Sequence, residues 1–371
     1  KEKRIELAKY EGVEFDTRTP EEAFVEFKKE YKDLQPVFYY SPIFKSFKTF
    51  INAKQSNSLI PFRGPINSKS LTCAEEGKYA LVENDMYGFK NQNEIYKKKI
   101  NSILLGDSYA EGKCQNSEND IAGHLTKKGN RTVSLGVSGT SALVALGIMK
   151  EFGGLIKPDN FIYLYYEGND LDGLNWEKNE KYLLKYLEKG HTYNYVKRFD
   201  EIKSFLKLSA NESINYLDTI DSKKNKIKRN NYEIIKENLI DIIELKKIKN
   251  IIRNVFSEKK HLEPDLKLLF SIFNEMKDEV EKQGANFIFV YVPNFVRYID
   301  VPDYSYGKQK NAIDLKDEIL EEVNKMEINN VDLTNFFDNT KNIEEYYPLG
   351  YVGHFNSKGY EKIAEIILNK I

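Results

Sequence analysis

Ile103-Leu-Leu-Gly-Asp-Ser108 is a short apolar run that ends abruptly in a glycine and two polar residues. A run of this length, closed by turn-forming residues, is typical of a strand that is buried on both faces. A helical pattern over residues 121–125 follows it, with Asp120 in the position that would cap the helix. Strand-like sequence begins again at Thr132. The segment therefore predicts a strand, a turn, a helix and a second strand.

The same alternation continues along the chain. We expect further strands at residues 132–135, 160–166, 286–293 and 328–333, with helices between them. Strands that alternate with helices over short connections form parallel sheets with right-handed crossovers. The sequence therefore predicts the α/β class, in the form of a three-layer α/β/α sandwich around a mostly parallel, flavodoxin-like sheet.

This pattern divides the chain into four segments. Residues 100–176 and 284–371 carry the strands and are expected to form the two halves of one sheet-containing domain. Residues 1–99 contain turn-rich stretches without regular alternation, so we expect an N-terminal extension that packs on this core. Residues 177–283 are rich in Lys and helical in period, which predicts a helical insert with a solvated, charged face.

The composition limits the classes of function. With 41% hydrophobic and 30% charged residues among 371, the chain is globular rather than disordered. Lys and Arg number 56 against 57 Asp and Glu, so no global positive field favours nucleic acid as a partner. The four histidines stand far apart and the two cysteines are too few for a zinc cluster, so we expect no metal. Without a GxGxxG or phosphate-loop motif, we also expect no cofactor.

Ser108, Gly139 and Asn169 stand at the ends of three predicted strands, and His354 stands shortly before the last predicted helix. In an open parallel sheet these positions converge at the carboxyl edge, where ligands bind. A serine becomes a nucleophile when a base takes its proton, and a histidine can serve as that base. The backbone N–H groups of Ser108 and Gly139 and the side-chain amide of Asn169 are suited to receive an oxyanion. The four residues together predict an acyl-transfer site with Ser108 as nucleophile and His354 as base.

Each of these residues also has a simpler structural explanation. A Gly-Asp-Ser triplet occurs by chance, and a lone histidine before a helix is more often a surface or capping residue. Asn169 and Gly139 by themselves are typical turn and helix-entry residues. The catalytic interpretation is favoured because all four positions fall at element ends that the hydrophobic pattern places independently.

In their chain order, Gly106-Asp-Ser108, Gly139, Gly168-Asn-Asp170 and His354-Phe-Asn356 resemble the motifs of the SGNH (GDSL-like) hydrolase superfamily. The resemblance covers residues 100–176 and 285–371 and implies the same roles for Ser108 and His354. It also implies a serine esterase or O-acetyltransferase that works through an acyl-Ser108 intermediate.

One position departs from the pattern of this superfamily. Its members usually have Asp three residues before the histidine, and Tyr351 stands there in this chain. We therefore expect a backbone carbonyl or another carboxylate to orient His354. The candidates for the third member of the triad are Asp338, Glu345, Glu344 and Asp332.

A narrower resemblance concerns the extension. Thr72-Cys-Ala-Glu-Glu-Gly77 and Asp85-Met-Tyr-Gly-Phe89 are similar to a subgroup found with bacterial surface-polysaccharide genes. This resemblance implies transfer or hydrolysis of an acetyl ester on a carbohydrate, an acyl donor, and a membrane acyltransferase as a partner. Two alternatives stay open: a degenerate member that only binds polysaccharide, and a hydrolase of lipids or other small esters.

Three further residues lie next to the site motifs. Trp176, just past the Asn169 turn, is expected to touch substrate. Asp107 and Asp170 are expected to bind backbone groups and shape their turns, with substrate binding as the alternative.

The two cysteines bear on the location of the protein. Cys73 lies in the extension, and Cys114 is expected two turns into the helix that Ser108 opens. We expect the two to form a disulfide, with two separate buried thiols as the alternative. A disulfide implies an oxidising compartment. The chain starts at Lys1 without a signal peptide, so either the protein is cytosolic or a leader or anchor was removed. The expected disulfide favours the second case, a periplasmic or cell-surface protein.

Overall fold

The computed structural model describes residues 1–41, 48–56, 58–229, 264–299 and 314–371. The chain forms two compact units, one of Lys1–Ala210 with Asp265–Ile371 and one of Asn211–Pro264. The predicted strands and site residues all belong to the first unit. No helix among the described residues combines the length and apolar character needed to cross a membrane.

A parallel sheet of five strands forms the centre of the first unit, in the order β6-β5-β7-β8-β9. Its strands are β5 (Ser102–Gly106), β6 (Thr132–Ser134), β7 (Asn160–Tyr166), β8 (Asn286–Val292) and β9 (Asn329–Asp332). The strand order turns back at β5, which pairs with both β6 and β7. Ligand sites of open parallel sheets lie at such a switch point, and Ser108 follows β5 directly.

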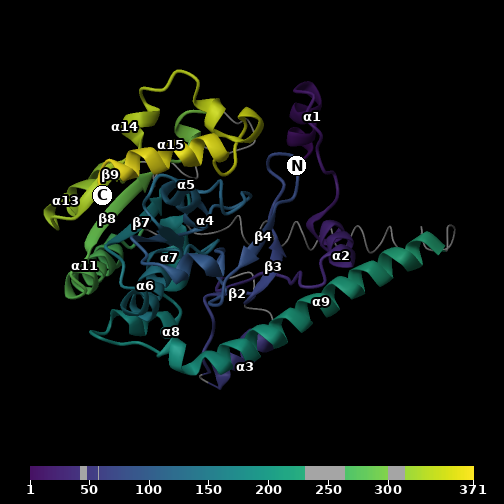
Figure 1. Cartoon of the computed structure of the whole chain (residues 1–371), viewed down its shortest axis with the longest axis horizontal. Coiled ribbons are helices and arrows are strands. Elements are labelled where there is room, and N and C mark those ends of the chain that lie inside the picture. Colours follow the sequence, from purple (N-terminus) through teal and green to yellow (C-terminus); the bar gives the residue numbers. More distant parts are fainter. Residues whose placement is uncertain (42–47, 57, 230–263, 300–313) are drawn as a thin grey trace. The chain divides into compact units, whose positions relative to one another are not determined.

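Successive residues of each strand face opposite sides of the sheet, so a core forms on each side. In β5, Ile103 and Leu105 face one core and Leu104 faces the other. Helices α6 (Ala142–Ile156), α11 (Leu266–Lys282) and α13 (Lys316–Lys325) cover the first core, and α5 (Ile121–Lys127) and α15 (Ser357–Leu368) cover the second. Figure 1 shows the strands between these helices, which confirms the predicted three-layer sandwich.

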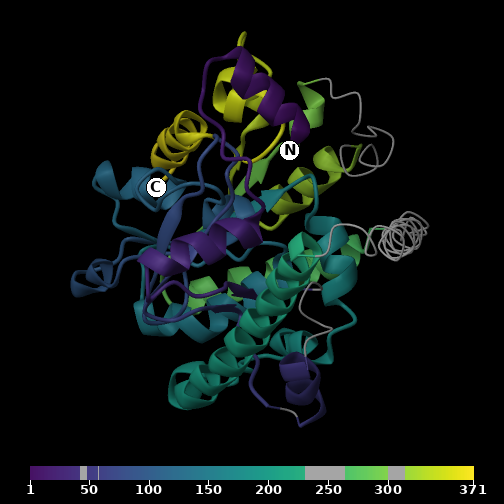
Figure 2. The same cartoon turned by 90° about the vertical axis from the view of Figure 1, so that its right-hand side faces the viewer.

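The N-terminal extension packs on this sandwich. Its aromatic residues Phe38, Tyr40 and Phe62 are buried in the first core. In both views α1 (purple) lies beside the C-terminal segment (yellow), and Arg4 of α1 donates a hydrogen bond to the carbonyl of Val352 at 2.6 Å (Figures 1 and 2). The extension comprises α1 (Glu2–Tyr10), α2 (Pro20–Glu30), β1 (Phe38–Tyr39), α3 (Lys48–Gln55), β2 (Arg63–Gly64), β3 (Ser68–Leu71), β4 (Leu81–Asn84) and η2 (Asn93–Lys97). The strands β1 and β2 pair antiparallel, as do β3 and β4.

The chain between β7 and β8 differs from the expected insert at residues 177–283. Phe273 of α11 and Ile202 of α9 are buried in the first core, and only Asn211–Pro264 forms a separate unit. Residues 230–263 of the expected insert lie outside the described residues. The described elements here are α7 (Asp170–Glu177), α8 (Lys181–Leu184), η3 (Lys185–Leu187), η4 (Tyr195–Arg198), α9 (Phe199–Arg229) and α11.

Short elements complete the second half of the sheet domain. They are η5 (Phe295–Arg297), α14 (Thr334–Phe337), η6 (Ile343–Tyr346) and η7 (Pro348–Gly350). The loop that follows η7 carries His354 to the sheet edge at which β5 ends.

Candidate active site

Ser108 lies at the sharp turn between β5 and the helix α4 (Ser108–Glu111). Gly106 makes this turn with a φ of 138°, and a Cβ there would approach the carbonyl oxygen of Leu164 to 2.6 Å, so the position requires glycine. Asp107 caps the helix by accepting a hydrogen bond from the backbone N–H of Tyr109 at 2.8 Å. Helix α4 is four residues long, so it contributes much less dipole at Ser108 than the longer helix expected from the sequence.

His354 is paired with Ser108. Its Nε2 lies 2.9 Å from the Oγ of Ser108, which confirms the predicted pair. The imidazole packs against the ring of Tyr109, with 5.1 Å between ring centroids, and the hydroxyl of Tyr109 donates to the carbonyl of Gly353. The side chain of His354 is 21% exposed, so the imidazole is partly accessible to solvent.

Glu75 of the extension occupies the other side of the imidazole. Its Oε2 lies 3.3 Å from Nδ1 of His354 and accepts a hydrogen bond from the backbone N–H of His354 at 2.8 Å. Its Oε1 lies 3.1 Å from the guanidinium of Arg4. Burial by itself would raise the pKa of the Glu75 carboxyl, but the hydrogen bonds and charges of His354 and Arg4 outweigh it and hold this pKa below its ordinary value. Glu75 is therefore placed to orient and stabilise the protonated imidazole.

The four acids proposed from the sequence as third members of the triad lie elsewhere. Asp338 accepts a hydrogen bond from the hydroxyl of Tyr298, and Asp332 is paired with Lys316. Glu345 accepts hydrogen bonds from Lys358 and Asn342, and Glu344 is exposed on η6. These residues precede His354 in the sequence, but the turns between η6 and His354 place its Nδ1 next to Glu75 of the extension instead.

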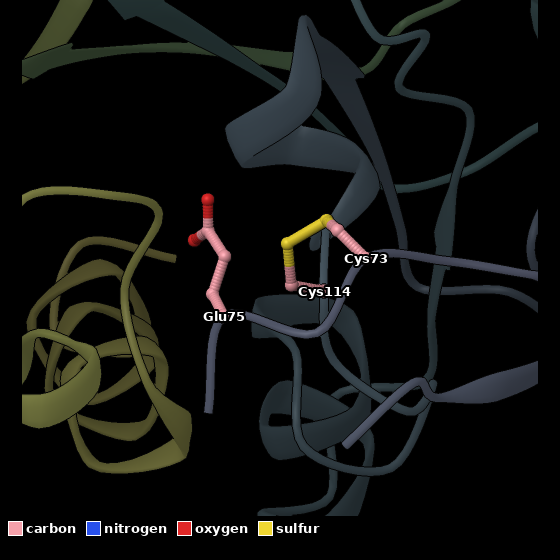
Figure 3. A group of neighbouring side chains, drawn as sticks. All are labelled: Cys73, Glu75 and Cys114. Carbon is pink, nitrogen blue, oxygen red and sulfur yellow. A yellow bond between two sulfur atoms is a disulfide. The ribbon is translucent and has the colours of Figure 1, made fainter. Parts of the chain in front are cut away.

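The expected disulfide joins Cys73 and Cys114, whose Cα atoms are 4.7 Å apart. Cys114 follows the end of α4, and its backbone N–H donates to the hydroxyl of Thr72 at 3.2 Å. The bridge lies beside the catalytic pair, because the Sγ of Cys114 is 3.9 Å from Nδ1 of His354. Figure 3 shows Glu75 on the loop that leads away from Cys73, so the bridge fixes the segment that carries the Glu75 carboxylate.

Gly139 belongs to a turn that is tied to the helix of Ser108. The preceding residue, Ser138, donates from its backbone N–H to the carboxylate of Glu111 at 2.9 Å, and its hydroxyl donates to the same oxygen. Gly139 itself has a φ of 75°, which favours glycine. A turn fixed in this way can present a backbone N–H to the oxyanion, as the sequence predicts.

Glu111 is held in place by two residues of the extension. Its Oε1 accepts hydrogen bonds from Arg63 at 3.1 Å and from the hydroxyl of Tyr39 at 3.0 Å. Burial would raise the pKa of Glu111, but Lys113, Arg63 and the Ser138 hydrogen bond lower it to about 2. The carboxylate is therefore charged at neutral pH and anchors the Gly139 turn.

Asn169 contacts the residue that precedes the nucleophile. Its side chain forms a hydrogen bond with the carboxyl group of Asp107, and its own Oδ1 is buried without a partner in the described part of the chain. The amide nitrogen has two hydrogens, and the bond to Asp107 uses one of them. The structure thus brings Asn169 to Ser108 through Asp107.

Asp107 and Asp170 each accept a hydrogen bond from a backbone N–H group at their turns. Both side chains are fully buried, and burial raises the pKa of each carboxyl. Asp170 accepts hydrogen bonds from the backbone N–H of Tyr166 at 3.0 Å and the hydroxyl of Tyr163 at 3.3 Å. These contacts fit the expected turn-shaping role, and the alternative of substrate binding stays a prediction for both.

Trp176 packs against the extension. Its ring lies 5.9 Å from that of Tyr40 and is partly buried. Its contact with substrate remains a prediction.

Two cavities in the described part of the chain lie apart from the catalytic pair. One of about 450 Å³ is lined by residues such as Asp120 and Arg131, and one of about 590 Å³ by residues such as Thr49 and Phe205. Neither is lined by Ser108 or His354. The chemistry of the charged and nucleophilic side chains therefore locates the site better than cavity size does.

The chain matches no family model and no curated protein. Several solved structures are similar to it. A lipolytic protein of the G-D-S-L family from Desulfitobacterium hafniense has a TM-score of 0.38 and 13% identity, over 74% of this chain and 100% of that one. A lipase/acylhydrolase from Enterococcus faecalis has a TM-score of 0.38 and 13% identity, over 73% and 95%. An acetylxylan esterase from Geobacillus stearothermophilus has a TM-score of 0.36 and 10% identity, over 74% and 95%.

The parallel sheet places Ser108 directly after β5 and brings His354 to it from the last loop. Gly139 and Asn169 are tied to the same helix start through Glu111 and Asp107. This fold, and the Ser, Gly, Asn and His motifs in their expected order, resemble those of the SGNH hydrolase superfamily.

Proposed function

We propose that the protein is a serine-dependent esterase or acyltransferase that acts on acyl esters of a carbohydrate. The observation that carries this proposal is the hydrogen-bonded series Ser108–His354–Glu75, with 2.9 Å from Oγ to Nε2 and 3.3 Å from Nδ1 to the carboxylate. A nucleophile, a base and a group that orients the base are the parts that acyl transfer requires.

In the proposed reaction, Ser108 Oγ attacks the ester carbonyl carbon while Nε2 of His354 takes the hydroxyl proton. The N–H groups of Ser108 and Gly139 and the amide of Asn169 bind the oxyanion. Collapse of the tetrahedral intermediate breaks the bond to the alcohol oxygen, which receives the proton from His354. Water or a sugar hydroxyl then attacks acyl-Ser108, with His354 again as base. The Glu75 carboxylate stabilises the imidazolium at each stage.

Glu75 also favours an enzyme over a degenerate polysaccharide-binding protein. The case for degeneracy rests on Tyr351 at the position of the usual aspartate. A carboxylate at Nδ1 that is only 12% exposed and paired with Arg4 supplies what Tyr351 does not. A protein that only binds glycan has no need for this arrangement.

The choice of a carbohydrate ester, with acetyl as the acyl group, rests on the extension. It resembles that of a polysaccharide-associated subgroup, and its residues Glu75, Arg63 and Tyr39 support the site. Transfer to or from a surface polysaccharide, with an acyl donor delivered by a membrane acyltransferase, is the form of the reaction that we favour. The Cys73–Cys114 disulfide supports a periplasmic or cell-surface location.

Two assays test the proposal. One measures hydrolysis of acetylated oligosaccharides and of short-chain lipid esters, and the other measures acetyl transfer from a donor to unacetylated sugars. We expect acetyl release from, or transfer to, the sugars by the wild type, and loss of both in Ser108→Ala. A serine-directed organophosphonate should label Ser108 in the wild type, because a binding protein has no reason to react. Absence of labelling and of turnover in a folded wild-type protein would refute the enzyme. Preference for the lipid esters would favour the lipid hydrolase instead.

A further inference from the structure

Four atoms of the kinds that bind transition metals lie close together at the Nδ1 side of His354. The two Sγ atoms of Cys73 and Cys114 and a carboxylate oxygen of Glu75 all lie within 4.8 Å of one another (Figure 3). The Nδ1 of His354 lies 3.9 Å from the Sγ of Cys114 and 3.3 Å from Oε2 of Glu75. Two sulfurs, an imidazole nitrogen and a carboxylate oxygen form a donor set suited to tetrahedral Zn²⁺. In the disulfide form the sulfurs are bonded to each other and cannot act as thiolate ligands.

We propose that reduction of the Cys73–Cys114 disulfide converts this cluster into a Zn²⁺ site that captures His354 and stops the reaction at Ser108. With a phosphine as reductant, the S–S bond breaks, both sulfurs become thiols, and the phosphine becomes its oxide with oxygen from water. Binding of Zn²⁺ then releases the two thiol protons to solvent. The metal site stands on its own, whereas the inhibition rests on the proposed function.

The ligands stay close together without the bridge because other contacts hold each of them. The N–H of Cys114 is bonded to Thr72, and the N–H of Thr72 donates to the carbonyl of Ala80 at 2.9 Å. Glu75 is held by Arg4 and by the backbone N–H of His354. Opening of the bridge therefore needs only side-chain rotation to place two thiolates around a metal ion.

The charges also balance. Two thiolates and one carboxylate around Zn²⁺ leave one net negative charge. The guanidinium of Arg4, 3.1 Å from Glu75, offsets it. A partly buried cluster without net charge avoids most of the cost of taking a charged group out of water.

The position of the metal explains why it would stop the reaction. A metal on Nδ1 of neutral imidazole leaves the hydrogen on Nε2, which is the nitrogen 2.9 Å from Ser108. Nε2 then donates a hydrogen bond and has no lone pair to take the proton of Ser108. The metal also takes the place of the hydrogen on Nδ1, so His354 loses its hydrogen bond to the Glu75 carboxylate.

The test compares zinc binding by the oxidised and the phosphine-reduced full chain, after anaerobic removal of the phosphine. We expect one Zn²⁺ per reduced chain in native mass spectra, bound at least about 100-fold more tightly than by the oxidised chain. Cys73→Ser/Cys114→Ser should lose this difference, and Glu75→Gln should weaken it. His191→Gln, a histidine away from the cluster, should retain it as the matched control. Ester turnover of the reduced chain should fall on zinc addition and return with a chelator.

Each result is informative about one proposal. Equal zinc binding by the oxidised, reduced and doubly substituted chains would overturn the site. Zinc bound by the reduced chain without loss of turnover would overturn the inhibition. If no form of the protein turns over esters, the proposed function fails, whereas the zinc stoichiometry still decides the metal site.

Discussion

In the proposed mechanism, the carboxylate of Glu75 stabilises the protonated form of His354. It approaches Nδ1 of His354 from a position 279 residues earlier in the sequence. Glu75→Gln keeps the shape and a hydrogen bond but removes the charge that stabilises the imidazolium. We expect the turnover number to fall by up to about 10⁴-fold, the loss seen when a serine triad loses its carboxylate. Steady-state kinetics on the best acetylated sugar measures it.

The neighbouring residue provides the control. Glu76 carries the same charge but is exposed, so Glu76→Gln should leave the turnover number within about 2-fold of the wild type. An equal loss in both variants would mean that net charge on the extension matters and that Glu75 has no special role.

Glu111 makes a second prediction at this scale. Glu111→Gln leaves Arg63 buried without its counter-charge and weakens the hold on Ser138. We expect a loss of about 3–5 kcal/mol in the free energy of unfolding at pH 7. Because folding lowers the pKa of Glu111 to about 2, this stabilisation is present above its ordinary value of 4.5 and disappears as the pH falls toward 2.

Denaturant unfolding at pH 7 and at pH 3 measures the effect of Glu111→Gln. Glu118→Gln, at an exposed glutamate in the loop after α4, serves as the matched control and should change stability by less than about 0.5 kcal/mol. A difference between wild type and Glu111→Gln that stays constant with pH would contradict a charged Glu111.

Sequence reasoning found Ser108 and His354 because both stand at element ends that the hydrophobic pattern marks. It missed Glu75 because the acid reaches His354 through tertiary packing of the extension, which no local pattern encodes. One signal was present: the predicted bridge brings Cys73 to the helix of Ser108, and Glu75 lies two residues beyond Cys73.

At the level of elements, a buried glutamate joins two helices near the site. Glu177, in the last turn of α7, accepts hydrogen bonds from the backbone N–H groups of Ser141, Leu143 and Val144 at 2.5, 3.0 and 3.2 Å. The first N–H groups of a helix have no acceptor within the helix, and the N-cap residue of α6 provides no side-chain cap. Glu177 therefore replaces the usual local cap with one from another helix.

Glu177→Ala should lower the free energy of unfolding by about 2–4 kcal/mol, because it leaves buried N–H groups without acceptors. Asp172→Ala, on the exposed side of the same helix, is the control and should change it by less than about 0.5 kcal/mol. Denaturant unfolding measures both variants. A stable Glu177→Ala protein would show that water or a neighbouring group satisfies the start of α6.

The sequence predicts the strands of the sheet correctly, but it does not predict the short length of the helix α4. Each strand of the sheet is buried on both faces, so its sequence is a continuous apolar run, as in β7 and β8. The helix α4 ends after four residues because Gly112 adopts the left-handed conformation, with a φ of 68°. A Cβ on Gly112 would lie 2.2 Å from that of Asp120, so close packing with the next helix start sets this end.

At the scale of the whole molecule, the extension is part of the active site. It provides Glu75 to the base, and Arg63 and Tyr39 to Glu111. The sheet domain alone therefore places Ser108 and His354, but it leaves His354 without Glu75 and Glu111 without Arg63 and Tyr39. The sequence predicted an extension packed on the core, whereas its contribution to the chemistry became visible only from the contacts.

The disulfide is the covalent link between the extension and the sheet domain, across a sequence separation of 41 residues. A bridge that closes a loop of this length restricts the unfolded chain, which corresponds to about 4 kcal/mol of stability in the chain-entropy model. We therefore expect Cys73→Ser/Cys114→Ser to unfold at a lower denaturant concentration, by a free energy of that size. Because Thr72, Arg4 and the N–H of His354 still hold the loop, we expect the folded variant to keep Glu75 near His354. Denaturant unfolding and ester turnover of the same sample separate the two effects. A loss of turnover as large as that of Glu75→Gln, in a folded variant, would show that the bridge itself positions the carboxylate.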